Sequence, residues 1–180
     1  PIDKGNYFKG AIDEVQIFNN ALSDAEVLAL YQDQNTEPVI TSDIVADYPM
    51  TGNANDVSEY HNNAIAAGAQ LTTDRHGLAN HAYTFNGIDA KITAPNSPQQ
   101  NTDFTTISFW INPKTLPASG ESFILSNGGW QERWKISLPA HGKVVFTTNG
   151  TGGISDMDAG GGNELTPGVW TMVTMTHDGN

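Results

Sequence analysis

Alternation of apolar and polar positions predicts β-strands along most of the chain. The clearest case is Ile107, Phe109 and Ile111, which alternate with the residues between them over 105–111. Further strands are predicted at 7–18, 44–50, 64–71, 82–85, 88–92, 122–126, 134–138, 143–148 and 169–177. Most of them follow one another at the spacing of about 8–12 residues that is typical of a sandwich. The pattern therefore predicts an all-β fold of two antiparallel sheets.

A single short helix is predicted just after the first strand. Ser23 is a good N-cap, and Glu26 stands three residues later, as a capping box requires. Val27, Leu30 and Tyr31 then form an apolar stripe at helical spacing. We expect this capping helix to end near Gln32.

The first strand carries the most informative charged residue. Alternation places Asp13 on the face of Val15 and Ile17, which is expected to be the core side, and Glu14 on the opposite face. A buried carboxylate needs a partner, because removing its charge from water costs free energy. Asp13 is thus a candidate site residue.

Composition limits the partners of the chain. It has 20 acidic and 8 basic residues among 180, a net charge of −12, and no cysteine. Nucleic acids and anionic membranes both attract basic patches, so this balance argues against either partner. No apolar run approaches the roughly 20 residues that a membrane span needs. The composition suits a secreted or cell-surface protein and is compatible with divalent cations.

Several segments carry a family likeness. Residues 8–18, 21–27 and 30–31 resemble the C-terminal end of laminin-G-like domains of the concanavalin A-like superfamily. The N-terminal three-quarters of the same family are similar to 47–50, 53–63, 83–87, 107–111 and 167–170. The resemblance implies a jelly-roll sandwich and a role in binding glycans or proteins.

The family's ending precedes its beginning, which leaves two organisations open. In the first, residues 1–34 end one repeat, 35–43 form a linker, and 44–180 begin the next repeat of a tandem array. We expect neighbouring repeats of the same chain to be partners in that case. In the second, the domain is circularly permuted. Both organisations leave an open sheet edge that needs a partner strand.

The resemblance also implies a structural Ca²⁺. Its expected ligands are Asp13, Asp56, Asn62 and Gly87, with the middle two in the oxygen-rich loop 53–63. This loop departs from the family pattern, because Glu59 and His61 replace the usual glycines. The alternative for Asp13 is a carboxylate that accepts backbone N–H bonds.

Contacts to a ligand are predicted in two other places. Trp130 follows a turn and can stack on a sugar ring, with Arg133 reading hydroxyl groups. Asp156 and Asp158 lie in the polar, glycine-rich stretch 149–163, which is predicted to be a loop, and are spaced like calcium or carbohydrate contacts. Solvated loop acids are the alternative for these two. The other tryptophans (Trp110, Trp134, Trp170) are interpreted as structural.

Catalytic signatures are absent from the sequence. Glycoside hydrolysis needs two carboxylates on one face, and the only adjacent acids on a predicted strand, Asp13 and Glu14, are expected on opposite faces. We therefore predict a non-catalytic binding or adhesion module that recognises a glycan or a protein. The alternative is a purely structural spacer repeat, and a glycoside hydrolase is the least favoured interpretation.

Overall fold

A computed structural model describes residues 5–32, 43–100, 102–128, 134–150, 153–158 and 163–179. Within these ranges the chain forms a six-stranded, a four-stranded and a two-stranded sheet with one α-helix, so the predicted all-β sandwich is confirmed. The strands are β1 (Lys9–Phe18), β2 (Ile44–Tyr48), β3 (Ile65–Ala67), β4 (Gln70–Thr72), β5 (Ala82–Asn86), β6 (Lys91–Thr93), β7 (Phe104–Pro113), β8 (Glu121–Asn127), β9 (Trp134–Pro139), β10 (Val145–Gly150), β11 (Gly153–Asp158) and β12 (Thr171–Asp178).

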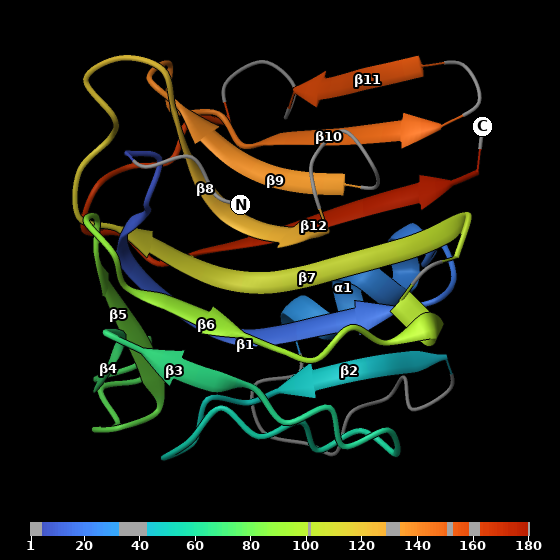
Figure 1. The fold of residues 1–180 in the computed structure, drawn as a ribbon, viewed down its shortest axis with the longest axis horizontal. Helices are drawn as coiled ribbons and strands as arrows, with labels where there is room; N and C mark the ends of the chain where they lie inside the picture. The colour runs from blue at the N-terminus through green and yellow to red at the C-terminus, as the bar shows by residue number, and fades with distance from the viewer. Residues whose placement is uncertain are drawn as a thin grey trace.

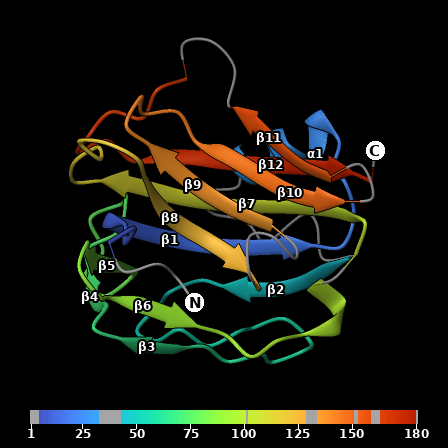
Figure 2. The ribbon, with the colours of Figure 1, turned by 45° about the horizontal axis from the view of Figure 1, so that its top comes forward.

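The two layers of the sandwich differ in continuity. The back layer is the six-stranded sheet, in the order β12-β7-β1-β5-β4 with β2 beside β1. The front layer holds the four-stranded sheet β11-β10-β9-β8 and, separately, the pair β3-β6 (Figure 1). Figure 2 shows β8 on one side of this break and β6 with β3 on the other.

β1 is the central strand of the back layer. It pairs with β7 along one edge, and its other edge pairs first with β5 and then with β2. Residues 9–18 therefore complete a sheet made by strands from 44–179, which is the arrangement that a circular permutation predicts. Boundaries at 1–34, 35–43 and 44–180 within a longer protein stay a prediction.

The core lies between the layers and confirms several expectations. Ile107, Phe109 and Ile111 are fully buried, as the alternation of β7 predicts. Trp134 is also buried and packs on Phe146, with ring centroids 6.2 Å apart. These side chains belong to one continuous core cluster, which joins the six-stranded sheet to the four-stranded sheet.

The helix α1 (Asp24–Gln32) has the predicted start. The Ser23 amide donates to Glu26 Oε2 over 2.8 Å, and the Glu26 amide approaches Ser23 Oγ at 3.4 Å, which completes the capping box. Val27 and Leu30 pack with Phe18 and Leu22 in a small second cluster. Among the described residues, no helix is long and apolar enough to cross a membrane.

Two local predictions are wrong. The stretch 149–163 is not simply a loop, because β11 (Gly153–Asp158) forms a hairpin with β10 inside it. Regular alternation also fails in β1, where the pairing with β7 shifts register between Asp13 and Gln16 and Glu14 takes a φ of +46°. This bulge keeps Val15 and Ile17 facing the core but turns Asp13 to the outer face, beside Glu14.

Candidate functional site

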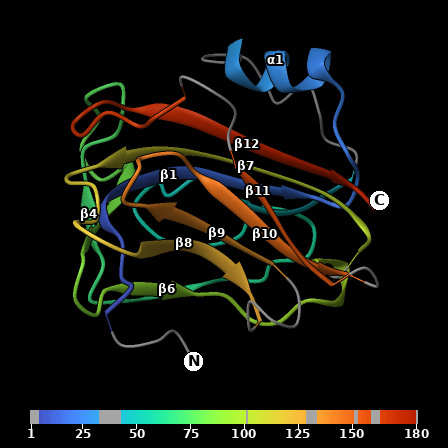
Figure 3. The ribbon, with the colours of Figure 1, turned by 90° about the horizontal axis from the view of Figure 1, so that it is seen from above.

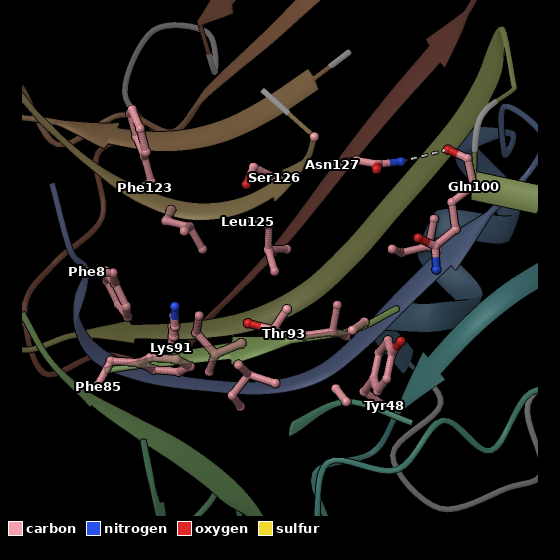
Figure 4. A pocket seen from close by; sticks show the side chains of 18 of the residues that line it. Phe8, Tyr48, Phe85, Lys91, Thr93, Gln100, Phe123, Leu125, Ser126 and Asn127 are labelled. Carbon is pink, nitrogen blue, oxygen red and sulfur yellow. Dashed lines mark hydrogen bonds between the residues drawn. The ribbon is translucent and has the colours of Figure 1, made fainter. Parts of the chain in front are cut away.

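A cleft of about 520 Å³ opens where the front layer is broken. Its floor is formed by Ile12, Val15 and Ile17 of β1, and its walls by β6 on one side and β8 on the other. Figure 4 shows the rings of Phe8, Phe85 and Phe123 together at one end of the cleft. The body of the cleft is therefore apolar, and it reaches the core of the sandwich.

Polar groups gather at the opposite end of the cleft. There the Asn127 side-chain amide donates to the Gln100 carbonyl oxygen over 3.2 Å (Figure 4). The side-chain nitrogen of Gln100 is buried without a hydrogen-bond partner among the described residues. Tyr48 lies near this end, and its hydroxyl donates to the Asn62 carbonyl over 2.9 Å. An apolar cleft with a few polar groups at one end is the usual form of a binding site.

The walls of the cleft are strand edges. β6 pairs with β3 and β8 pairs with β9, and the described part of the chain places no second strand beside either of them on the cleft side. A single bridge between Tyr7 and Phe123 is the exception at one end of β8, where the Phe123 amide donates to the Asn6 carbonyl. Such edges offer main-chain groups to an incoming chain.

A buried ion-pair cluster lies on the other face of β1. Arg75 donates to Asp13 Oδ2 over 3.0 Å and to both carboxylate oxygens of Glu14 over 3.0 Å. The side chains of Arg75 and Asp13 are 7% and 3% exposed, whereas that of Glu14 is 45% exposed. The Arg75 guanidinium also lies 4.6 Å from the centroid of the Trp110 ring. The expectation that Asp13 and Glu14 point to opposite faces is thus wrong.

Burial dominates the electrostatics of this cluster. Desolvation, with the neighbouring Glu14 charge, raises the pKa of Asp13 to about 7, although Arg75 acts in the opposite direction. Desolvation likewise raises the pKa of Asp47 to about 6. Both carboxyl groups therefore bind a proton more tightly in the folded chain than in the unfolded chain.

This shift predicts a pH-dependent effect of Asp13→Asn. Because the folded-state pKa lies above the unfolded value of 3.8, wild-type stability from this group is greatest at low pH and falls as the pH rises through about 7. One pKa unit corresponds to about 1.4 kcal/mol, so the contribution of Asp13 to the free energy of unfolding falls by a few kcal/mol over this pH range. As the pH rises from 4 to about 8, we expect the free energy of unfolding of the variant to increase relative to that of wild type. Urea titrations at several pH values measure this difference. Asp103→Asn, at an exposed position, is the control; a difference for Asp13→Asn that does not vary with pH would contradict the assignment.

Asp56 has a different environment. Its Oδ1 accepts the amides of Asp47 and Ser58, and its Oδ2 accepts the amide of Asn62, each over 2.9 Å. The residue is 2% exposed. The carboxylate therefore holds the loop 53–63 against β2 through backbone N–H bonds.

The four residues predicted to bind calcium do not form one ligand set. Arg75 engages Asp13, and three amides engage Asp56, so neither carboxylate is directed at a shared ion.

Gly87 lies in the turn after β5 at φ +75°, next to the side chain of Lys9. Within the described ranges no three Asp, Glu or His side chains are grouped closely enough to hold a metal ion. Asn62 would coordinate a cation through its side-chain oxygen, and its side-chain nitrogen is buried without a partner among the residues that the structure describes. The geometry does not fit the implied ion, and calcium binding stays an untested prediction.

The predicted ligand contacts have mixed outcomes. Trp130 and Arg133 lie outside the described residues. Asp156 is exposed on β11 and accepts a hydrogen bond from the Thr147 hydroxyl across the hairpin. Asp158 ends the same strand. The predicted roles of these four residues in ligand binding remain untested.

Comparison with known proteins decides the family. A laminin G-type family model, described as the concanavalin A-like lectin/glucanases superfamily, matches residues 86–180. The chain belongs to this superfamily. Neither the curated proteins nor the solved structures contain a match. The concanavalin A-like match starts at the end of β5, so it covers the second half of the sandwich, whereas β1 lies outside it.

Concanavalin A-like membership fits a carbohydrate- or protein-binding module, although the superfamily also includes glycosidases. The bulge in β1 brings two carboxylates, Asp13 and Glu14, to one face. Arg75 bridges them, however, and neither lines the cleft between the sheets. A general acid must reach its substrate, and the buried Asp13 carboxylate does not have that access.

Proposed function

We propose that this chain is a non-catalytic binding module of a secreted or cell-surface protein, and that it recognises an extended segment of a partner protein. The observation that supports this most strongly is the cleft between β6 and β8, which combines an apolar floor with strand edges as walls. An extended peptide can pair its main chain with such edges and direct alternate side chains onto the floor.

The chemistry of the cleft favours a polypeptide over a glycan at this position. Aliphatic side chains of Ile12, Val15 and Ile17 offer no partners to sugar hydroxyl groups, which would lose their hydrogen bonds to water. In a peptide with alternating apolar residues, the apolar side chains can pack on the floor of the cleft. Its main-chain groups can form hydrogen bonds with the strand edges in place of those to water.

A capped peptide of about eight residues with alternating valine and threonine tests the proposal. We expect it to bind, and to protect the amides of β6 and of residues 124–126 from hydrogen exchange. Thr93 is exposed and lines the cleft, so Thr93→Trp should fill the space and weaken binding at least about tenfold, which equals about 1.4 kcal/mol. Binding is measured by calorimetry.

Two controls make the result specific. Thr176→Trp places the same side chain at an exposed position of β12, outside the cleft, and should leave binding unchanged. A peptide of the same composition with its valines in one block lacks the alternation and should bind more weakly. Equal binding of both peptides, or protection confined to other strands, would refute the proposal.

A further inference from the structure

The cleft between β6 and β8 has a direction, because its two walls run the same way. Figures 2 and 3 show the arrows of β6 and β8 pointing in the same general direction on either side of the break in the front layer. Lys91 of β6 and Phe123 of β8 accordingly lie at one end of the cleft (Figure 4). Thr93 and Asn127 lie further along the same two strands. Because antiparallel pairs are slightly more stable per residue than parallel ones, a strand that enters antiparallel to both walls is favoured, and its C-terminal end lies at Lys91 and Phe123.

Lys91 is the only charged residue among the described residues that line the cleft. The sequence has 20 acidic residues and 8 basic ones, yet no Asp or Glu of the described ranges lines the cleft. Lys91 is exposed, and no ion pair involves it within the same ranges. Figure 4 shows its amino group pointing from β6 into the cleft, beside the ring of Phe8. A carboxylate at this end would therefore meet one unpaired positive charge and no negative one.

The same end of the cleft is closed by the chain itself. Tyr7 forms a bridge with Phe123, and the Phe123 amide donates to the Asn6 carbonyl over 2.7 Å. Because β9 pairs with the other edge of β8, this bridge lies on the cleft side. A strand that runs along the cleft toward Lys91 meets Tyr7 in its path. A chain terminus fits this end, whereas the middle of a longer chain does not.

The opposite end of the cleft presents a hydrogen-bond donor. The side-chain nitrogen of Gln100 is buried and has no hydrogen-bond partner among the described residues. Figure 4 shows this side chain directed into the cleft, toward the ring of Tyr48. A buried donor without an acceptor costs free energy, and a main-chain carbonyl of an incoming strand would supply the acceptor. The free edge of β8, residues 124–127, spans about four residues of such a strand.

We infer that the cleft binds the free C-terminal end of its partner chain, with the α-carboxylate paired with Lys91 and the preceding residues antiparallel to β6 and β8. The inference rests on the proposed function, and it adds the end and the direction of the segment that the cleft accepts. Strand addition to an edge and capture of a C-terminal carboxylate are both general modes of peptide recognition. Here the α-carboxylate lies at the closed end, while alternate side chains of the same segment still face the apolar floor.

Peptides that differ only in their end groups test the inference. The valine–threonine peptide with an acetylated N-terminus and a free C-terminal carboxylate is compared by calorimetry with the fully capped peptide. We expect the free acid to bind at least about fivefold more tightly, because charge-assisted hydrogen bonds are stronger than neutral ones. An N-succinyl peptide with a C-terminal amide has the same charge at the other end and should bind no more tightly than the capped peptide. Since the chain has a net charge of −12, general attraction of an anion does not explain a gain for the free acid.

Substitutions of Lys91 test the contact itself. Lys91→Met keeps a side chain of similar length and removes its charge. We expect it to abolish the preference for the free acid and to leave the affinity for the capped peptide within about twofold of wild type. Lys91→Arg retains the charge and should retain the preference. Lys114→Met, which removes an exposed cation that does not line the cleft, should leave the preference unchanged.

The outcomes separate this inference from the proposed function. Equal affinity for the capped and the free-acid peptides would overturn the inference while still supporting a peptide cleft. Tighter binding of the N-succinyl peptide than of the free acid would reverse the direction of the segment and overturn the inference as well. A preference for the free acid that persists in Lys91→Met would place the carboxylate elsewhere, which contradicts the assignment to Lys91. If none of the peptides binds, the proposed function fails and the inference fails with it.

Discussion

Asp56→Ala is expected to lower the free energy of unfolding by about 4 kcal/mol, since it removes a buried carboxylate that accepts three backbone amides. Each amide would be left without its acceptor in a region where Asp56 itself is 2% exposed. The loop 53–63 would lose its attachment to β2 through the amide of Asp47. Urea unfolding followed by far-UV circular dichroism measures the effect, at constant slope if the loss is one of stability alone.

Two further variants separate the causes. Asp56→Asn keeps one side-chain oxygen, which can still accept the amides of Asp47 and Ser58. Its side-chain NH2 group would then face the amide of Asn62, so that one hydrogen bond is lost. We therefore expect about half of the loss in free energy of unfolding that Asp56→Ala causes. Asp103→Ala changes an exposed carboxylate and should cost less than about 0.5 kcal/mol. If Asp56 were instead a calcium ligand, wild type would gain stability on addition of Ca²⁺ and the variants would not. Such a calcium-dependent gain, together with a small loss for Asp56→Ala in a chelator, would overturn the backbone-anchor role.

Local chemistry explains which elements could be predicted from the sequence. The capping box of Ser23 and Glu26 is made by residues three apart, so its signal is complete within one turn of chain. The alternation over β7 is equally local, because each side chain's face follows from the period of the strand. Both predictions are confirmed for this reason.

Backbone irregularity explains where the prediction for β1 fails. A bulge needs one residue in an unusual conformation, and Glu14 adopts a φ of +46° without any glycine or asparagine to mark it. The partner that stabilises this conformation, Arg75, is more than sixty residues away in the sequence. Periodicity within the strand therefore does not indicate that Asp13 leaves the core face.

The cleft could not be predicted for a related reason. Its floor belongs to β1 and its walls belong to β6 and β8, which lie far from β1 in the sequence. Lys91 stands in a short strand, and its local pattern does not distinguish it from other exposed lysines. Only the tertiary arrangement places it at the end of an apolar cleft.

The central position of β1 leads to the second large expected effect. Gly10→Ala should lower the free energy of unfolding by about 3 kcal/mol or more, because the new methyl group has no room. A Cβ at this position would lie 2.4 Å from the carbonyl oxygen of Asn112 and 2.8 Å from the Cα of Pro113, both in the backbone of β7. No side-chain rotation relieves a contact with backbone, so β1 and β7 would have to separate.

Gly52→Ala is the matched control for this substitution. Gly52 has a φ of +75°, and no atom of the described residues lies within 4 Å of the position that a methyl group would take. Alanine there should therefore suffer only the left-handed backbone cost of about 1 kcal/mol. A larger loss at Gly10 than at Gly52, measured by urea unfolding, would show that close approach of β1 to β7 demands the glycine. Equal losses would mean that β1 does not pair with β7 at this point. Because the cleft takes its floor from the same strand, Gly10→Ala should also weaken peptide binding, whereas Gly52→Ala should not.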